Sequence, residues 1–117
     1  MRLVVKSVVL FLVIMFSLLM LSSCGPNQQQ LERFASCLSE KGVVMYGASW
    51  CPHCTEQKEL FGAAFSKVKY VECVAEENKC TEEGIQFLPT WKFSDGSIRT
   101  GVMKFSELAQ KSECVLS

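Results

Sequence analysis

The sequence predicts an α/β fold in which helices cover one central sheet. Segments with a helical spacing of apolar residues alternate with short runs of branched and aromatic residues, which are typical of buried strands. The last two strand-like runs are separated by an Asp-Gly pair, a sequence that favours a hairpin turn. Alternation followed by a hairpin indicates a single sheet with helices packed on it.

Residues 1–23 are expected to be a lipoprotein signal peptide rather than part of this fold. Arg2 and Lys6 precede an apolar run over residues 8–21, and a charged start with a short apolar core is typical of a secretory signal. The run is shorter than the about 20 residues of a spanning helix. It ends in Leu-Ser-Ser-Cys, which resembles the lipobox of bacterial lipoproteins and makes Cys24 the lipidated residue. The alternative is an uncleaved signal anchor with an ordinary cysteine.

Residues 24–30 are predicted to be the lipidated cysteine and a polar tether, and residues 31–117 a single small domain. The tether follows from the sequence Gly-Pro-Asn-Gln-Gln-Gln. The chain carries 12 basic and 12 acidic residues, and this balance does not suggest a nucleic-acid partner. No dimerisation extension is recognisable, so we expect a monomer.

The elements of the domain are predicted in the order helix, strand, helix, strand, helix, strand, strand, helix. Apolar residues at spacings of three and four begin the first helix at Leu31, and Gly42 ends it. Pro52 suits the first turn of the second helix, where its missing N–H costs nothing. Ser106 is expected to cap the last helix. The predicted ranges are, in order, 31–41, 43–46, 52–66, 68–74, 78–84, 85–93, 98–102 and 106–112.

Cysteine is the most informative part of the composition. The seven cysteines are Cys24, Cys37, Cys51, Cys54, Cys73, Cys80 and Cys114. An odd number in an exported protein suggests a spare thiol, and assigning the first of them to lipid leaves an even set. A domain so dense in cysteine fits an oxidising compartment.

The sequence Trp50-Cys51-Pro52-His53-Cys54 lies where the first core strand leads into a helix. A helix N-terminus carries unsatisfied N–H groups and about half a positive charge. This charge stabilises a thiolate, which is the reactive form of cysteine. The pair is therefore a candidate redox centre. The alternatives are a structural disulfide and a metal-binding site.

These features resemble the thioredoxin superfamily. The matching pieces are the strand 43–46, the Trp-Cys-Pro-His-Cys motif at a helix start, and Leu88-Pro89-Thr90 before the terminal hairpin. The resemblance implies a thioredoxin-like fold, with a central mixed β-sheet flanked by helices. Similarity extends to one branch, the thioredoxin-like domain associated with bacterial and plastid homologues of vitamin K epoxide reductase. It lies in Cys37-Leu38, 44–48, 50–54, 59–61, 70–73 and 89–91.

The resemblance implies a role for each residue of the motif. Cys51 would be the exposed nucleophile and Cys54 the more buried resolving thiol. Pro89 would be the family's cis-proline, Leu88 would offer backbone hydrogen bonds to a bound peptide, and Trp50 would shield the site. No cofactor is implied.

The same resemblance implies partners and a location. In that branch a membrane enzyme oxidises the thioredoxin-like domain and passes electrons to a quinone, and the domain oxidises exported proteins. We therefore expect a lipid-anchored thiol–disulfide oxidoreductase of the bacterial cell envelope, facing the periplasm or the cell exterior. Its partners would be exported protein thiols and disulfides and a membrane oxidase resembling vitamin K epoxide reductase.

Two sequence features favour oxidation over reduction. Reducing thioredoxins carry a buried acid six residues before the first cysteine, and Met45 stands there in this chain. Pro52 and His53 lie between the cysteines and are expected to tune the redox poise. A partly protonated His53 would stabilise the reduced form of the pair, which makes the disulfide a better oxidant. The alternative is a neutral, solvent-exposed histidine.

The remaining cysteines are assigned less directly. Cys73 and Cys80 match a second pair in the resembled branch and are expected to form a structural disulfide, or else a second pair that relays electrons. Cys37 and Cys114 are left over. In the usual layout of the resembled family the first and last helices cover opposite faces of the sheet, so a bridge between these cysteines would form at an edge. Either cysteine could instead be a free thiol or contact a partner.

Three other functions remain open at this stage. A reductase or isomerase would use the same cysteines. A copper carrier would bind through Cys51, Cys54 and His53, because copper(I) favours thiolates, although the chain has no second histidine. A redox-inert interaction domain would keep the pair as a structural disulfide. Structural zinc wants four ligands, and covalent haem needs a histidine where Thr55 stands, so no metal site is predicted.

Overall fold

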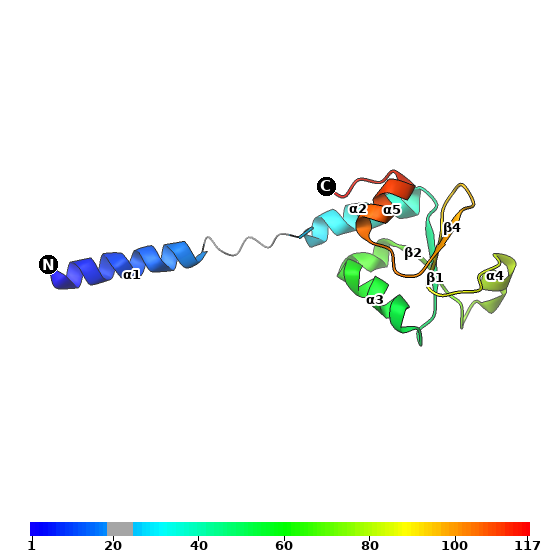
Figure 1. The fold of residues 1–117 in the computed structure, drawn as a ribbon, viewed down its shortest axis with the longest axis horizontal. Coiled ribbons are helices and arrows are strands. Elements are labelled where there is room, and N and C mark those ends of the chain that lie inside the picture. The colour runs from blue at the N-terminus through cyan, green and yellow to red at the C-terminus, as the bar shows by residue number, and fades with distance from the viewer. Residues whose placement is uncertain (19–24) are drawn as a thin grey trace.

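The computed structural model describes residues 1–18 and 25–117 (Figure 1). The predicted lipidation site, Cys24, lies outside the described residues. Within the two described ranges, no helix is both long and apolar enough to span a membrane.

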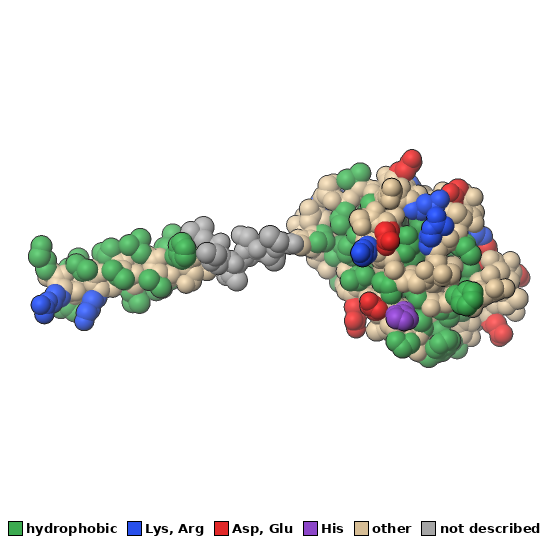
Figure 2. Space-filling model, viewed as in Figure 1, with side chains coloured by type: hydrophobic (Ala, Val, Ile, Leu, Met, Phe, Trp, Pro, Cys, Tyr) green, Lys and Arg blue, Asp and Glu red, His purple; other side chains and the backbone are tan. Residues whose placement is uncertain are grey.

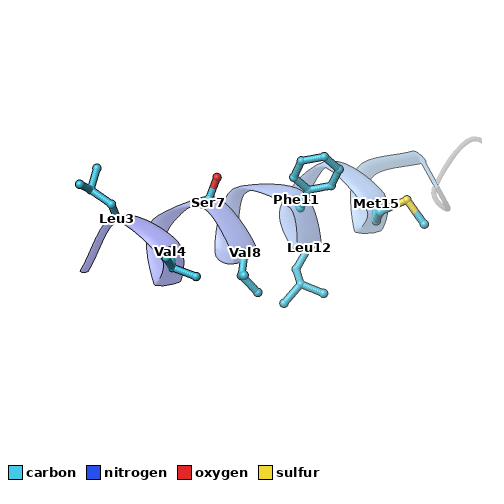
Figure 3. A pocket seen from close by; sticks show the side chains of 7 residues that line it. All are labelled: Leu3, Val4, Ser7, Val8, Phe11, Leu12 and Met15. Carbon is cyan, nitrogen blue, oxygen red and sulfur yellow. The ribbon is translucent and has the colours of Figure 1, made fainter. Parts of the chain in front are cut away.

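The helix α1 (Arg2–Leu18) covers the predicted signal segment. Its large apolar side chains are exposed, and Figure 3 shows Phe11 and Leu12 pointing to different sides of the helix. The helix therefore has no distinct polar face over its apolar run, unlike a helix that packs on the surface of a globular domain.

The domain contains one mixed sheet with the strand order β2-β1-β3-β4. The strands are β1 (Val44–Gly47), β2 (Lys69–Glu72), β3 (Thr90–Lys92) and β4 (Ile98–Thr100). The first two are parallel, and β3 is antiparallel to both of its neighbours. A parallel pair needs a long crossover, which the helix after the Trp-Cys-Pro-His-Cys motif supplies.

The helices of the domain follow the predicted order. They are α2 (Gln28–Glu40), α3 (Pro52–Phe61), the 3₁₀ helix η1 (Gly62–Lys67), α4 (Glu77–Glu82) and α5 (Phe105–Ser112). The predicted architecture, a mixed sheet flanked by helices, is confirmed.

The first helix of the domain begins earlier than predicted. Asn27 Oδ1 accepts a hydrogen bond from Gln30 N at 2.9 Å, and Gln30 Oε1 accepts one from Asn27 N at 2.8 Å. This reciprocal capping box fixes the start at Gln28. The prediction of a tether over residues 24–30 is therefore wrong for its last three residues, where glutamine favours the helix.

Two other helix boundaries also differ from the prediction. The helix that begins at Pro52 is α-helical only to Phe61, because Gly62 adopts a positive φ of 57° and the chain continues as a 3₁₀ helix. Ser106 is not the cap of the last helix. Lys104 holds that position, and its N–H donates to the Glu107 carboxylate at 2.8 Å.

Strands β3 and β4 are joined by the predicted hairpin turn. Gly96 in this turn has a φ of 82°, a conformation that glycine adopts without strain. Asp95 accepts hydrogen bonds from the Ser97 hydroxyl at 2.6 Å, from Ser97 N at 2.9 Å and from Lys111 Nζ at 2.9 Å. The Ser97 hydroxyl first, and then Lys111, hold the pKa of Asp95 well below its usual range.

An aromatic cluster joins α2, α3 and α5 over the sheet. The Phe34 ring lies 5.8 Å from Phe105 and 6.4 Å from Phe61, between centroids. Phe61 in turn lies 4.9 Å from Phe105 and 6.2 Å from Trp91 of β3. The first and last helices of the domain therefore pack against each other. The expectation that they cover opposite faces of the sheet is wrong.

Candidate active site

Cys51 and Cys54 lie at the N-terminus of α3, directly after the loop that leaves β1. Cys51 is the N-cap residue, and its Sγ accepts a hydrogen bond from Cys54 N at 3.3 Å. Pro52 occupies the first helical position, as predicted. Within the described residues these two are the cysteines that carry free thiols. The Cys51 sulfur therefore faces the positive end of the α3 dipole.

The two thiols differ in burial, though less than expected. Cys51 is 5% exposed and Cys54 is fully buried. The expectation that Cys51 is exposed is therefore wrong. The capping geometry turns its sulfur toward the backbone of α3. Burial, followed by the hydrogen bond with Cys51, raises the pKa of the Cys54 thiol to about 11. Cys54 is therefore protonated at neutral pH when the pair is reduced.

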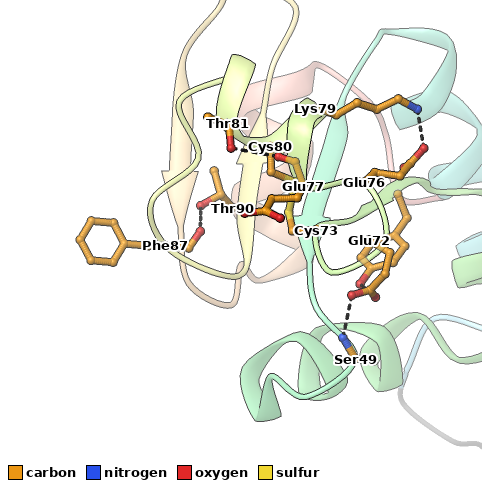
Figure 4. Close-up of a disulfide and its surroundings, with 11 residues drawn as sticks. Ser49, Glu72, Cys73, Glu76, Glu77, Lys79, Cys80, Thr81, Phe87 and Thr90 are labelled. Atoms are coloured by element: carbon orange, nitrogen blue, oxygen red, sulfur yellow. Dashed lines mark hydrogen bonds and ion pairs between the residues drawn. A yellow bond between two sulfur atoms is a disulfide. The ribbon is translucent and has the colours of Figure 1, made fainter.

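A groove of about 320 Å³ opens beside Cys51. It brings together parts of the chain that lie far apart in sequence. Trp50 and Phe87 on its rim are 70% and 67% exposed, and Figure 4 shows Phe87 pointing outward. The residues that line it include Trp50, Cys51, Cys73, Cys80, Phe87 and Leu88.

Two of the three residues predicted to contact a peptide lie in this groove. Trp50 and Leu88 line it, and Pro89, which follows Leu88, is buried. The Leu88–Pro89 peptide bond is cis, as the resemblance implied. The Thr90 hydroxyl donates to Phe87 O at 2.5 Å and holds the two ends of this loop together (Figure 4).

Two disulfides brace the site from outside the motif. One joins Cys73 to Cys80 and ties the end of β2 to α4 (Figure 4). The other joins Cys37 of α2 to Cys114, which follows α5. The second bridge is possible because these helices share the aromatic cluster. The Cys73–Cys80 pairing matches the expectation, and the Cys37–Cys114 bridge is one of the alternatives that the sequence left open.

The His53 side chain pairs with Glu56 rather than with a cysteine. Its ring lies at the surface, beside acidic side chains (Figure 2). Its Nδ1 atom is 3.2 Å from Glu56 Oε2, one turn further along α3. The tuning of Cys51 by His53 stays a prediction.

Gln57 is a buried polar residue that the sequence did not single out. It lies in α3, three residues after Cys54, and is fully buried. Its Oε1 accepts hydrogen bonds from Trp91 Nε1 at 3.1 Å and from Met103 N at 2.7 Å, and its Nε2 donates to Met103 O at 3.1 Å. These bonds fix α3 to β3 and to the segment before α5, and so hold the helix that carries the thiols.

A second set of side chains that the sequence did not single out surrounds Tyr70, whose hydroxyl lies near the Cys54 sulfur beside Gly47. Tyr70 of β2 donates its hydroxyl to Glu72 at 2.7 Å, and Ser49 N donates to the other oxygen of the same carboxylate at 3.0 Å. The Nζ atom of Lys58 lies 4.0 Å from the centre of the Tyr70 ring. Met45, where reducing thioredoxins carry an acid, is fully buried and apolar.

No metal-binding cluster is found in the part of the chain that the structure describes. There, no group of three or more histidine, cysteine, aspartate or glutamate side chains is placed to hold an ion. Cys51 Sγ caps the helix that carries Cys54, and this geometry suits a pair of thiols that can form a reversible disulfide.

No family model matches the sequence. The chain is 39% identical over 82 residues to the thiol-disulfide oxidoreductase LTO1 of Arabidopsis thaliana, which covers 62% of this chain and 22% of that protein. It is 31% identical over 74 residues to protein disulfide-isomerase of Aspergillus niger, covering 56% of this chain and 14% of the relative. The fold is thioredoxin-like. These likenesses support membership of the thioredoxin superfamily.

Two solved thioredoxins share part of this arrangement. Thioredoxin NaTrxh of Nicotiana alata has a TM-score of 0.44 at 25% identity, over 59% of this chain and 67% of that structure. Thioredoxin Mala s 13 of Malassezia sympodialis has a TM-score of 0.47 at 25% identity, over 60% and 73%. The chain spans less than a quarter of the length of the curated relatives described above.

Proposed function

We propose that this chain is a thiol–disulfide oxidoreductase that donates disulfides to exported proteins through Cys51 and Cys54. The observation that carries the proposal is the geometry of the pair. Cys51 caps α3 beside a surface groove, and Cys54 lies one turn deeper with its N–H directed at the Cys51 sulfur. This arrangement places one sulfur at the wall of a surface groove, where it can exchange with a substrate, and keeps the other fully buried for resolution.

In the oxidising direction, a substrate thiolate attacks Sγ of Cys51 in the Cys51–Cys54 disulfide. The bond between the two cysteines breaks, and its electron pair stays on Cys54. A second substrate thiolate then attacks the substrate sulfur of the mixed disulfide and releases Cys51. The substrate loses two electrons, and the protein gains them as two thiols. A membrane oxidase that resembles vitamin K epoxide reductase would take these electrons and restore the disulfide.

The proposal includes attachment to the cell envelope through lipid on Cys24, with the domain facing the periplasm or the cell exterior. The charged start, the apolar α1 helix and the Leu-Ser-Ser-Cys sequence support this location. The two disulfides outside the motif agree with an oxidising compartment. Each buried CH₂ of an acyl chain contributes about 0.8 kcal/mol to membrane binding.

Trapping of the mixed disulfide tests the exchange chemistry. In Cys54→Ser, Cys51 can still attack or receive a substrate sulfur, but no thiol resolves the adduct. We expect Cys54→Ser to accumulate covalent adducts with exported proteins that dithiothreitol releases, and Cys51→Ser to accumulate none. Equal adduct formation by both variants, or none by either, would overturn the assignment of Cys51 as the nucleophile.

Reduction or isomerisation of disulfides is the second candidate. The names of two curated relatives favour it, the disulfide-isomerase of Aspergillus niger and protein disulfide-isomerase A5 of Bos taurus, which is 32% identical over 53% of this chain and 14% of its own length. The buried Met45 in place of an acid favours oxidation instead. Reactivation of a substrate with scrambled disulfides would distinguish them, because an isomerase restores activity without an added oxidant.

A further inference from the structure

The disulfide exchange proposed above, on which this inference rests, requires Cys54 to leave as a thiolate from a buried position. When a substrate thiolate bonds to Cys51, the electron pair of the old bond passes to Cys54, which later takes up a proton. Burial disfavours this thiolate, as the raised pKa of Cys54 shows. A group that favours negative charge at this sulfur would therefore speed the exchange.

Lys58 is placed to supply that positive charge. It lies four residues after Cys54 in α3, so both side chains lie on the same face of the helix, one turn apart. The charge of Lys58 opposes the rise in the Cys54 pKa. Its side chain is half-buried, so solvent screens its charge less than that of an exposed lysine.

Aromatic rings hold the Lys58 ammonium on this side of the helix. Its Nζ atom lies 4.0 Å from the centre of the Tyr70 ring and 5.6 Å from that of Phe65, both within the range of a cation–π contact. The two rings lie edge to face with centroids 5.5 Å apart. The ammonium is thus fixed by α3, η1 and β2 together.

The Tyr70 ring also lies close to the Cys54 sulfur. The Tyr70 hydroxyl and Cys54 Sγ are each 3.1 Å from the point where a Cβ atom of Gly47 would stand, so they are at most twice that distance apart. Only glycine allows this approach, since a Cβ would also lie 2.9 Å from a ring carbon of Tyr70. The hydrogen bond to Glu72, which Ser49 N also holds, fixes the hydroxyl end of the ring.

The other titratable groups near Cys54 do not supply positive charge. Burial, and then the hydrogen bond to Glu72, raise the pKa of Tyr70, so its hydroxyl stays neutral. Glu72 is an acid and Cys51 is a second thiol. Among the described residues near Cys54, the positive charge is therefore that of the Lys58 ammonium.

We propose that Lys58 is a positioning residue that stabilises the Cys54 thiolate as the disulfide opens. In reducing thioredoxins a buried acid assists the exchange by moving a proton. In this chain the positive charge of Lys58 assists it by favouring the Cys54 thiolate. Because Cys54 is protonated in the resting reduced protein, the charge acts on the rate of exchange more than on the equilibrium potential at neutral pH.

The test is the rate at which dithiothreitol opens the Cys51–Cys54 bond of the oxidised full chain, followed by tryptophan fluorescence across neutral and mildly alkaline pH. Lys58→Met keeps the apolar stem on the rings but removes the charge, and we expect the rate to fall roughly five- to tenfold. Lys58→Arg should keep at least about half of the rate, since it keeps the charge. Lys67→Met, a matched change at an exposed lysine of η1, should react like the wild type.

Titration of the same variants against glutathione provides the second readout. We expect an unchanged equilibrium constant for Lys58→Met at neutral pH. A rate equal to that of the wild type, or an equal loss in the Met and Arg variants, would overturn the inference and leave Lys58 a packing residue. If Lys58→Met does not fold, Lys58→Gln removes the charge instead. If the wild-type bond neither forms nor opens, the proposed function fails, and this inference with it.

Discussion

Replacing Gln57 with methionine should destabilise the domain by about 3–6 kcal/mol. The methionine side chain fills nearly the same volume, but it cannot replace the three hydrogen bonds that the amide makes. Trp91 Nε1 and both backbone groups of Met103 would then be left without partners. Each unsatisfied buried polar group costs about 1–3 kcal/mol. We take the lower part of this range because Met103 is 7% exposed and water can reach its backbone.

Urea unfolding at neutral pH, followed by circular dichroism, measures this loss. Gln110→Met is the matched control, since Gln110 is an exposed residue of α5 and such a change usually stays within about 0.5 kcal/mol. Domains of this kind have total stabilities of about 5–15 kcal/mol. The variant should therefore unfold at a much lower urea concentration or fail to fold.

A second substitution separates the hydrogen bonds from the volume of the side chain. Trp91→Phe removes the indole donor, so combining it with Gln57→Met should cost less than the sum of the two single losses. A loss below about 1 kcal/mol for Gln57→Met would refute the reasoning. It would mean that the amide is replaced by water or that α3 does not depend on these bonds.

Two further predictions concern stability. The Cys37–Cys114 bridge spans 77 residues and the Cys73–Cys80 bridge spans 7. Replacing both cysteines of a bridge with alanine should cost about 4–5 kcal/mol for the long loop and about 2–3 kcal/mol for the short one, measured by urea unfolding. Equal losses would contradict this. The pKa of Asp95 is depressed in the folded state, so its stabilising effect is present above the unfolded pKa of about 3.9 and disappears as the pH falls below it. Asp95→Asn should therefore lose less stability than the wild type between about pH 5 and pH 2 in acid titrations of the urea midpoint, and parallel curves would contradict this.

The order of the elements could be predicted because it depends on local patterns. The apolar spacing from Leu31, the branched run that became β1 and the Asp-Gly turn each act within a few residues of the chain. The position of Cys51 at a helix start follows in the same way, because Pro52 suits the first helical position. Local chemistry therefore placed the thiols correctly in the fold.

The predicted helix starts were wrong where a hydrogen bond with a side chain, rather than the spacing of apolar residues, determines the first residue of the helix. The helix α2 begins at Gln28 because Asn27 and Gln30 form a capping box, and the polar run before Leu31 looked like a tether. At α5 only half of such a box is present, the hydrogen bond from Lys104 N to the Glu107 carboxylate, and the helix begins one residue before Ser106.

The supporting residues of the site could not be predicted because they meet only in the folded chain. Lys58 and Glu72 look like ordinary surface charges in the sequence, and Gln57 belongs to no recognised motif. Their roles depend on which faces of α3 and β2 meet. The pairing of Cys37 with Cys114 likewise depends on α2 and α5 packing together, which the predicted element order left open.

The redox potential of the Cys51–Cys54 pair tests the central claim most directly. The full chain would be equilibrated with glutathione buffers, and its free thiols quantified by alkylation and mass spectrometry, with Cys51→Ser as the control. A disulfide donor should have a potential well above that of thioredoxin, which is about −270 mV. A potential near or below that value would contradict the proposed direction of electron flow and identify the protein as a reductase.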